Sequence, residues 1–206
     1  MVKGLSHWSG AVALMAACTT LYFGADASAA NVQVTVVDAQ GRPLQDAVVF
    51  LDSPELARSV KPLAGAAMGQ RNKMFEPATL VVTRGTAVDF PNRDTVRHHV
   101  YSFSPAKKFE LKLYTGTPAT PVVFDQAGIV VLGCNIHDHM VGWVVVVETP
   151  YFALADAMGN TQIKEVPAGN YQMRVWHNSL AVGAPAQVQA LRVGADPVSA
   201  SVTLKH

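Results

Sequence analysis

The organisation of this chain follows from the stretch Cys-Asn-Ile-His-Asp-His-Met-Val-Gly-Trp, residues 134–143. It places a thiol, two imidazoles and a thioether close together, at Cys134, His137, His139 and Met140. Thiolate and thioether sulfur favour Cu(I), and imidazole suits both copper oxidation states. A trigonal set of two histidines and one cysteine, with a distant axial methionine, is typical of electron-transfer copper. The stretch therefore predicts a metal site.

Apolar runs flank this stretch on both sides. Residues 129–132, Ile-Val-Val-Leu, are typical of a buried strand that delivers Cys134 at its end, and residues 141–147, Val-Gly-Trp-Val-Val-Val-Val, are typical of the returning strand. The short loop between them would let Cys134, His137 and Met140 converge on one point. A trigonal site needs one more imidazole, which we expect from another strand end.

His98, in the segment 89–100, is the candidate for that imidazole. If this segment is a strand, the neighbouring His99 points to the opposite face, so both cannot easily face one ion. His139 could replace Met140 and give a nitrogen-rich site suited to zinc or non-blue copper. The alternative interpretation of His139 is a solvent-exposed loop histidine.

Residues 73–147 resemble the cupredoxins. The C-x2-H-x2-M spacing is the amicyanin form of the ligand loop, and the residues before it match the family's lead-in: Phe75, Pro77, Leu80, Val81, Val82, Gly85, Val88, Phe90, Asn92 and Asp94. The resemblance implies a Greek-key β-sandwich with one type 1 copper ion, whose ligands would be His98, Cys134, His137 and Met140. One position departs from the family, because cupredoxins commonly carry Asn where this chain has His99; such contacts around a ligand tune the metal.

The resemblance also implies a function. Such a chain carries single electrons between redox proteins and turns over no substrate, with His137 as the electron port. Its layout is similar to that of methylamine-utilisation accessory proteins, which makes an amine dehydrogenase or a cytochrome the implied kind of partner. A periplasmic copper chaperone or store is the alternative, because spare imidazoles at His99 and His139 would help to pass the metal on. A structural adaptor with incidental copper is a third class.

Residues 1–29 have the pattern of a secretory signal peptide, with an apolar stretch at 10–23 that ends near Ala-Ser-Ala. The stretch is too short to span a membrane, so we expect export to the periplasm. A lipid anchor at Cys18 is the alternative. After cleavage only Cys134 of the 2 cysteines would remain, and no internal disulfide could form. A lone exported thiol is reactive unless it is buried in the core or bound to metal.

The two ends of the remaining chain predict a second β-sandwich. Valines at alternate positions open residues 31–54, and a Gly/Pro turn leads to a second strand. This opening resembles the carboxypeptidase regulatory-like module, as does the D-x-x-G…V-P-x-G-x-Y-x-x-x-V-W-H pattern of residues 155–177. We therefore expect an all-β chain with a discontinuous sandwich at 30–63 and 150–206 and an inserted cupredoxin domain at 64–149.

Composition excludes several other classes. Hydrophobic residues make up 50% of the chain, charged residues 15%, and the net charge is +1, so no basic footprint for nucleic acid exists. No apolar segment after the signal is long enough to span a membrane. Residues 59–70 contain Pro62, Gly65 and Gly69 and predict a linker, with a short helix at 63–68 as the alternative that the two glycines oppose.

Overall fold

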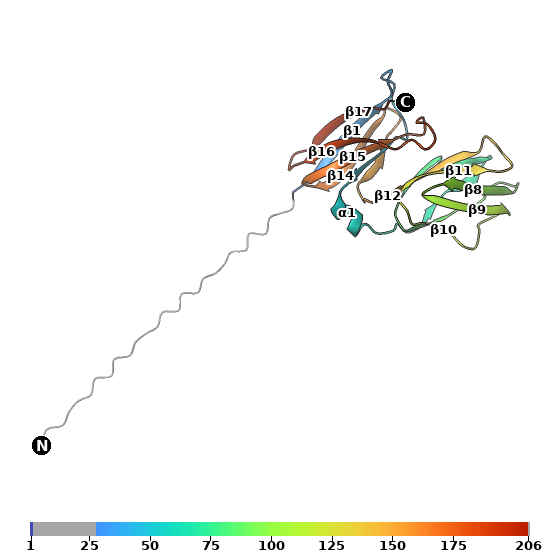
Figure 1. Cartoon of the computed structure of the whole chain (residues 1–206), viewed down its shortest axis with the longest axis horizontal. Helices are drawn as coiled ribbons and strands as arrows, with labels where there is room; N and C mark the ends of the chain where they lie inside the picture. The colour runs from blue at the N-terminus through green and yellow to red at the C-terminus, as the bar shows by residue number, and fades with distance from the viewer. Residues whose placement is uncertain (2–27, 206) are drawn as a thin grey trace.

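The computed structural model describes Met1 and residues 28–205, and the all-β prediction is confirmed. Two β-sandwiches lie side by side and are joined by two chain crossings (Figure 1). The predicted signal peptide falls almost wholly outside the described residues. Within the described part, no helix has the length and apolar character to cross a membrane.

The first sandwich, called the outer sandwich, is built from both ends of the described chain. Its strands are β1 (Ala29–Val37), β2 (Val48–Asp52), β13 (Phe152–Leu154), β14 (Asn160–Pro167), β15 (Gly169–Trp176), β16 (Gln187–Val193) and β17 (Val198–Thr203). They form two sheets, with orders β14-β1-β17 and β13-β2-β15-β16. Val32, Val34 and Val36 alternate with more exposed residues and pack with Leu51 and Met173 in one core. This alternation is the signal that predicted β1.

The second sandwich, called the inserted sandwich, lies between β2 and β13 in the sequence. It follows the short helix α1 (Pro54–Ser59) and comprises β3 (Ala66–Ala67), β4 (Gly69–Arg71), β5 (Met74–Glu76), β6 (Thr79–Thr83), β7 (Thr86–Asp89), β8 (His98–Ser104), β9 (Lys107–Tyr114), β10 (Val122–Phe124), β11 (Gly128–Cys134) and β12 (Val141–Val147). Sheet β6-β12-β11-β8-β9 faces sheet β10-β7-β3, and β4 pairs with β5. The expected linker thus already contains β3 and the start of β4.

Strand pairing closes the outer sandwich around the insert. β1 pairs antiparallel with β14 and parallel with β17, and β2 pairs with β13 and β15. Residues 29–52 therefore take their strand partners from residues 152–203. The domain boundaries at 63/64 and 149/150, and the likeness of the outer strands to the regulatory-like module, stay predictions.

One side chain contacts both crossings between the sandwiches. The guanidinium of Arg84, at the end of β6, donates a hydrogen bond to the carbonyl of Ala57 in α1 at 3.1 Å and pairs with Glu148 at 3.2 Å. Ala57 belongs to the crossing into the inserted sandwich, and Glu148 to the crossing out of it. Arg84 therefore joins the entry and the exit of the insert.

Strand β12 is buried on both faces. Val144 and Val146 pack in the core of the inserted sandwich, whereas Val145 and Val147 pack against the outer sandwich beside Trp176. A strand covered on both sides reads as a continuous apolar run rather than an alternating one. The contact between the sandwiches therefore explains why four consecutive residues, 144–147, are all valine.

We expect Trp176→Ala to weaken this contact. Trp176 is 3% exposed, and its ring lies 6.4 Å from that of Trp143, centroid to centroid. Truncating a buried Trp costs about 3–5 kcal/mol of unfolding free energy. Urea unfolding followed by circular dichroism measures the loss. Val182→Ala is the control, because Val182 is 83% exposed and its truncation should stay within about 0.5 kcal/mol. Equal unfolding free energies of the two variants would contradict a stabilising contact of Trp176 between the sandwiches.

Candidate metal centre

The predicted strand and returning strand around residues 134–143 are present. β11 ends at Cys134 and β12 begins at Val141, and the two strands pair antiparallel. Val130, Leu132 and Cys134 lie on the same face of β11 and are at most 4% exposed. The alternation of the strand therefore directs the thiol into the core of the inserted sandwich.

Backbone hydrogen bonds make the loop between these strands tight. The N–H of His137 donates to the carbonyl of Cys134 at 3.4 Å, and the N–H of Met140 donates to the carbonyl of His137 at 2.9 Å. The N–H of Asn135 donates to the carbonyl of His99 at 3.1 Å, which ties the loop to β8. Loop and strand are thus held together by main-chain atoms, whatever the side chain at position 99.

Three of the predicted site residues meet at one point. Cys134 Sγ lies 3.8 Å from Nδ1 of His98 and 3.6 Å from Nδ1 of His137, and the three ligand atoms all lie within 4.8 Å of one another. His98 is fully buried, Cys134 is 4% exposed, and His137 is half-buried. Among the described residues, this is the one group of three or more such side chains that could hold an ion.

The spacing of these atoms fits a bound metal. With metal–sulfur bonds of about 2.3 Å and metal–nitrogen bonds of about 2.0 Å, the sulfur and nitrogen of two ligands lie about 3.5–3.8 Å apart. The distances from Cys134 Sγ, 3.8 and 3.6 Å, match that range. The donors are therefore already placed for an ion between them, without a change of backbone.

The other residues considered in the sequence lie around this point. Met140 is 1% exposed and belongs to the same apolar core as Cys134, and its role as axial ligand stays a prediction. His99 is directed away from the centre, because its Nε2 lies 2.8 Å from Oε1 of Glu110. His139 is exposed, with its ring 6.2 Å from that of His137. The contacts of His98 with Cys134 and of His99 with Glu110 agree with the prediction that the two histidines point to opposite faces of the strand.

The electrostatic surroundings of the centre favour a neutral imidazole at His137. Its pKa is held below the ordinary value, first by desolvation and then by nearby basic side chains, among them the ammonium of Lys73. A neutral imidazole is the form that binds metal. Burial opposes ionisation of Asp94, but hydrogen bonds from the amide of Lys73 and from His98 outweigh it and hold the pKa of that carboxyl below its usual range.

Sequence reasoning missed part of this surrounding. Asp94 Oδ2 lies 2.8 Å from Nε2 of His98, whereas the sequence places Asp94 only in the family's lead-in, four residues before the histidine, with no role at the metal centre. Gln70 is fully buried and donates through Nε2 to Tyr114 Oη at 2.6 Å, while Tyr114 donates to the carbonyl of Phe90 at 2.8 Å. Burial, with a contribution from the charge of Cys134, raises the pKa of Tyr114 to about 12.

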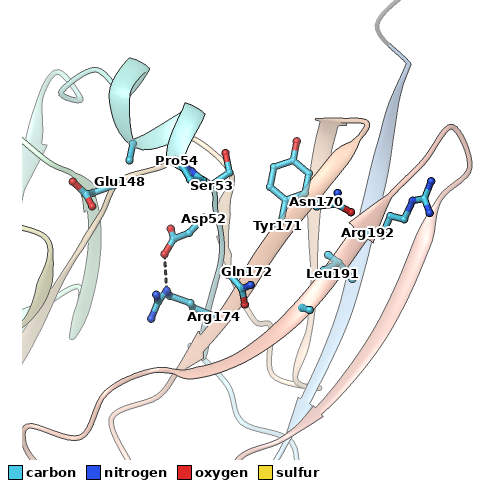
Figure 2. A pocket seen from close by; sticks show the side chains of 12 residues that line it. Asp52, Ser53, Pro54, Glu148, Asn170, Tyr171, Gln172, Arg174, Leu191 and Arg192 are labelled. Atoms are coloured by element: carbon cyan, nitrogen blue, oxygen red, sulfur yellow. Dashed lines mark hydrogen bonds and ion pairs between the residues drawn. The ribbon is translucent and has the colours of Figure 1, made fainter.

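A cavity of about 750 Å³ lies outside this centre, on the outer sandwich (Figure 2). Asp52 lines it and accepts a hydrogen bond from Nε of Arg174 at 2.6 Å, while its Oδ1 is buried without a partner in the described chain. Burial raises the pKa of Asp52 and outweighs the charge and hydrogen bond of Arg174, which act in the opposite direction. The cavity contributes no side chain to the candidate metal centre.

No protein-family model and no curated protein matches this sequence. Among solved structures, a purple cupredoxin from Nitrosopumilus maritimus is 24% identical and matches 40% of this chain and 99% of its own, with a TM-score of 0.36. A reduced Cu(I) form of an amicyanin variant is 24% identical and matches 48% of this chain and 98% of its own, with a TM-score of 0.36. An oxidised amicyanin variant is 25% identical, with the same coverage and TM-score. These three similar structures are cupredoxins, and each matches less than half of this chain.

We expect His137 in the metal-free protein to titrate below 6.5, its ordinary value, because desolvation and neighbouring positive charge disfavour the protonated ring. Lys73→Gln should move the midpoint upward, since it removes one of those charges. A pH titration of the imidazole signals by nuclear magnetic resonance measures both. Lys164→Gln, a charge removed from the outer sandwich, should leave the midpoint unchanged. A midpoint at or above 6.5 in the unaltered protein would contradict this account.

Proposed function

We propose that this chain is a periplasmic type 1 copper protein that carries single electrons between redox partners. The observation that carries the proposal is the convergence of His98 Nδ1, Cys134 Sγ and His137 Nδ1 within 4.8 Å of one another, at the buried end of paired strands. Two imidazoles and one thiolate in this arrangement form the trigonal set of electron-transfer copper.

The donor set favours copper over harder metals. Cys134 supplies a soft sulfur that magnesium and calcium do not prefer, and Met140 lies in the same buried core, available as a weak axial ligand. Zinc accepts the same nitrogen and sulfur donors, so the choice between zinc and copper rests on the cupredoxin-like spacing of the loop. Copper, when bound, would supply one-electron exchange between Cu(I) and Cu(II).

The residues of the chain would then keep the ion in place and give electrons a way out. Paired strands and the backbone bonds of the loop hold Cys134 and His98 nearly fixed, so little has to move when the charge of the ion changes. His137 is the half-buried member of the set, and the adjacent Ile136 is 48% exposed. A redox partner, such as an amine dehydrogenase or a cytochrome, would dock against this edge, and no substrate would be transformed.

Cys134→Ser tests the proposal directly. Loss of the thiolate should abolish the intense sulfur-to-copper absorption band while the far-ultraviolet circular dichroism stays that of the unaltered protein. His139→Ala is the control and should keep the band, because His139 is exposed and lies outside the three-donor group. A colourless copper complex of the unaltered protein, or zinc held in preference to copper, would exclude type 1 copper.

A copper chaperone or store is the second candidate, and the position of His139 favours it. Its exposed imidazole, 6.2 Å from the ring of His137, could take over a copper ion that leaves the centre. A carrier must instead keep its ion in both oxidation states. The burial of His98 and Cys134 argues for retention.

Copper retention separates the two candidates. We expect repeated reduction and oxidation in the presence of a moderate Cu(I) chelator to release no copper, because two of the three donors are closed to solvent. His139→Ala should leave this behaviour nearly unchanged. Copper is measured by the absorbance of the chelator complex. Rapid transfer that slows on removal of His139 would favour the copper-handling function.

A further inference from the structure

Asp94 hydrogen-bonds to two separate parts of the inserted sandwich, the buried His98 and the turn between β4 and β5. Its Oδ2 lies 2.8 Å from Nε2 of His98 and accepts the N–H of Lys73 at 2.9 Å, and its Oδ1 accepts the N–H of Asn72 at 2.6 Å. The side chain of Asp94 is only 12% exposed. The carboxylate therefore connects the buried histidine to the turn between β4 and β5.

This contact determines which nitrogen of His98 is free. A carboxylate that already accepts backbone N–H groups can only accept from the imidazole, so the ring proton must lie on Nε2. The lone pair then lies on Nδ1, the atom 3.8 Å from Cys134 Sγ. His98 is fully buried, so its ring has no contact with bulk solvent and Nε2 depends on Asp94 as its partner.

The turn that contacts Asp94 has a specific backbone conformation. Asn72 and Lys73 both have positive φ, 54° and 58°, a conformation that aims two successive amides at one acceptor. The backbone of Asp94 is held by Asn92, whose Oδ1 accepts the N–H of Asp94 at 2.9 Å. Nδ2 of Asn92 donates to the carbonyls of Val96 and Tyr114 at 2.8 and 2.9 Å. The segment that carries Asp94 is thus held at both ends.

We propose that Asp94 is a positioning residue for the metal centre, which fixes the tautomer and ring direction of His98 and sets the balance between Cu(II) and Cu(I). The proposal rests on the proposed copper function. An imidazole hydrogen-bonded to a carboxylate is a stronger donor, and partners of this kind contribute about 10–100-fold to metal affinity. The added negative charge favours the more highly charged Cu(II).

Asp94→Asn tests the proposal in the full chain. We expect a loss of Cu(II) affinity of about 10–100-fold, measured by chelator competition. Cu(I) affinity should fall less, so the reduction potential should rise, by about 59 mV for each tenfold difference between the two losses. Asp94→Glu keeps the carboxylate and should recover part of the change.

Glu110→Gln is the matched control. Glu110 makes the same kind of contact, 2.8 Å to Nε2 of His99, on the opposite face of β8. Its removal should leave the potential and the copper affinity unchanged. An equal shift in Glu110→Gln and Asp94→Asn, or no shift in a folded Asp94→Asn, would overturn the positioning role.

A second measurement needs neither a variant nor copper. The nitrogen-15 shifts of His98 in the metal-free protein should show the proton on Nε2, and a proton on Nδ1 would overturn the proposal. This measurement separates the role of Asp94 on His98 from the proposed copper function. An Nε2 proton in a protein that gives no coloured copper complex would support the role of Asp94 on His98 while excluding the electron carrier.

Discussion

The burial of β12 on both faces is the constraint on which the rest of the structure depends. Val144 and Val146 complete the core of the inserted sandwich, while Val145 and Val147 complete the contact with the outer one. β11 pairs with this doubly covered strand along most of its length and ends at Cys134. The position of the thiol is therefore set by packing that extends well beyond the loop carrying it.

The centre combines two kinds of environment. His98 and Cys134 are enclosed by core side chains and backbone hydrogen bonds, whereas His137 lies where the loop reaches the surface. Enclosed donors keep an ion and limit the movement that a change of charge requires. A donor at the surface shortens the distance to a partner. The arrangement would thus meet the two demands on the proposed electron carrier, retention of the ion and contact with a partner, with different residues.

The sequence predicts the parts of this structure that depend on local pattern. The strands around Cys134 follow from apolar runs of strand length, and the opposite directions of His98 and His99 follow from the period of two. Asp94 could not be predicted as the partner of His98, since their contact also needs the turn more than twenty residues earlier. β3 and β4 are missed because short Gly- and Ala-rich strands gain their order from neighbours, as in the bond from Met68 N–H to the carbonyl of Asp89. Such tertiary contacts leave no periodic signal.

The parallel pairing of β1 with β17 has a mechanical consequence. Six residue pairs, from Val32 with Val198 to Val37 with Thr203, join strands that run in the same direction. A pull applied before β1 and after β17 would load these hydrogen bonds together in shear rather than one after another. The inserted sandwich lies between β2 and β13, off this line of force, and is not loaded until the outer sandwich opens. The candidate copper centre is in this sense shielded from tension by the strands that enclose its insertion point.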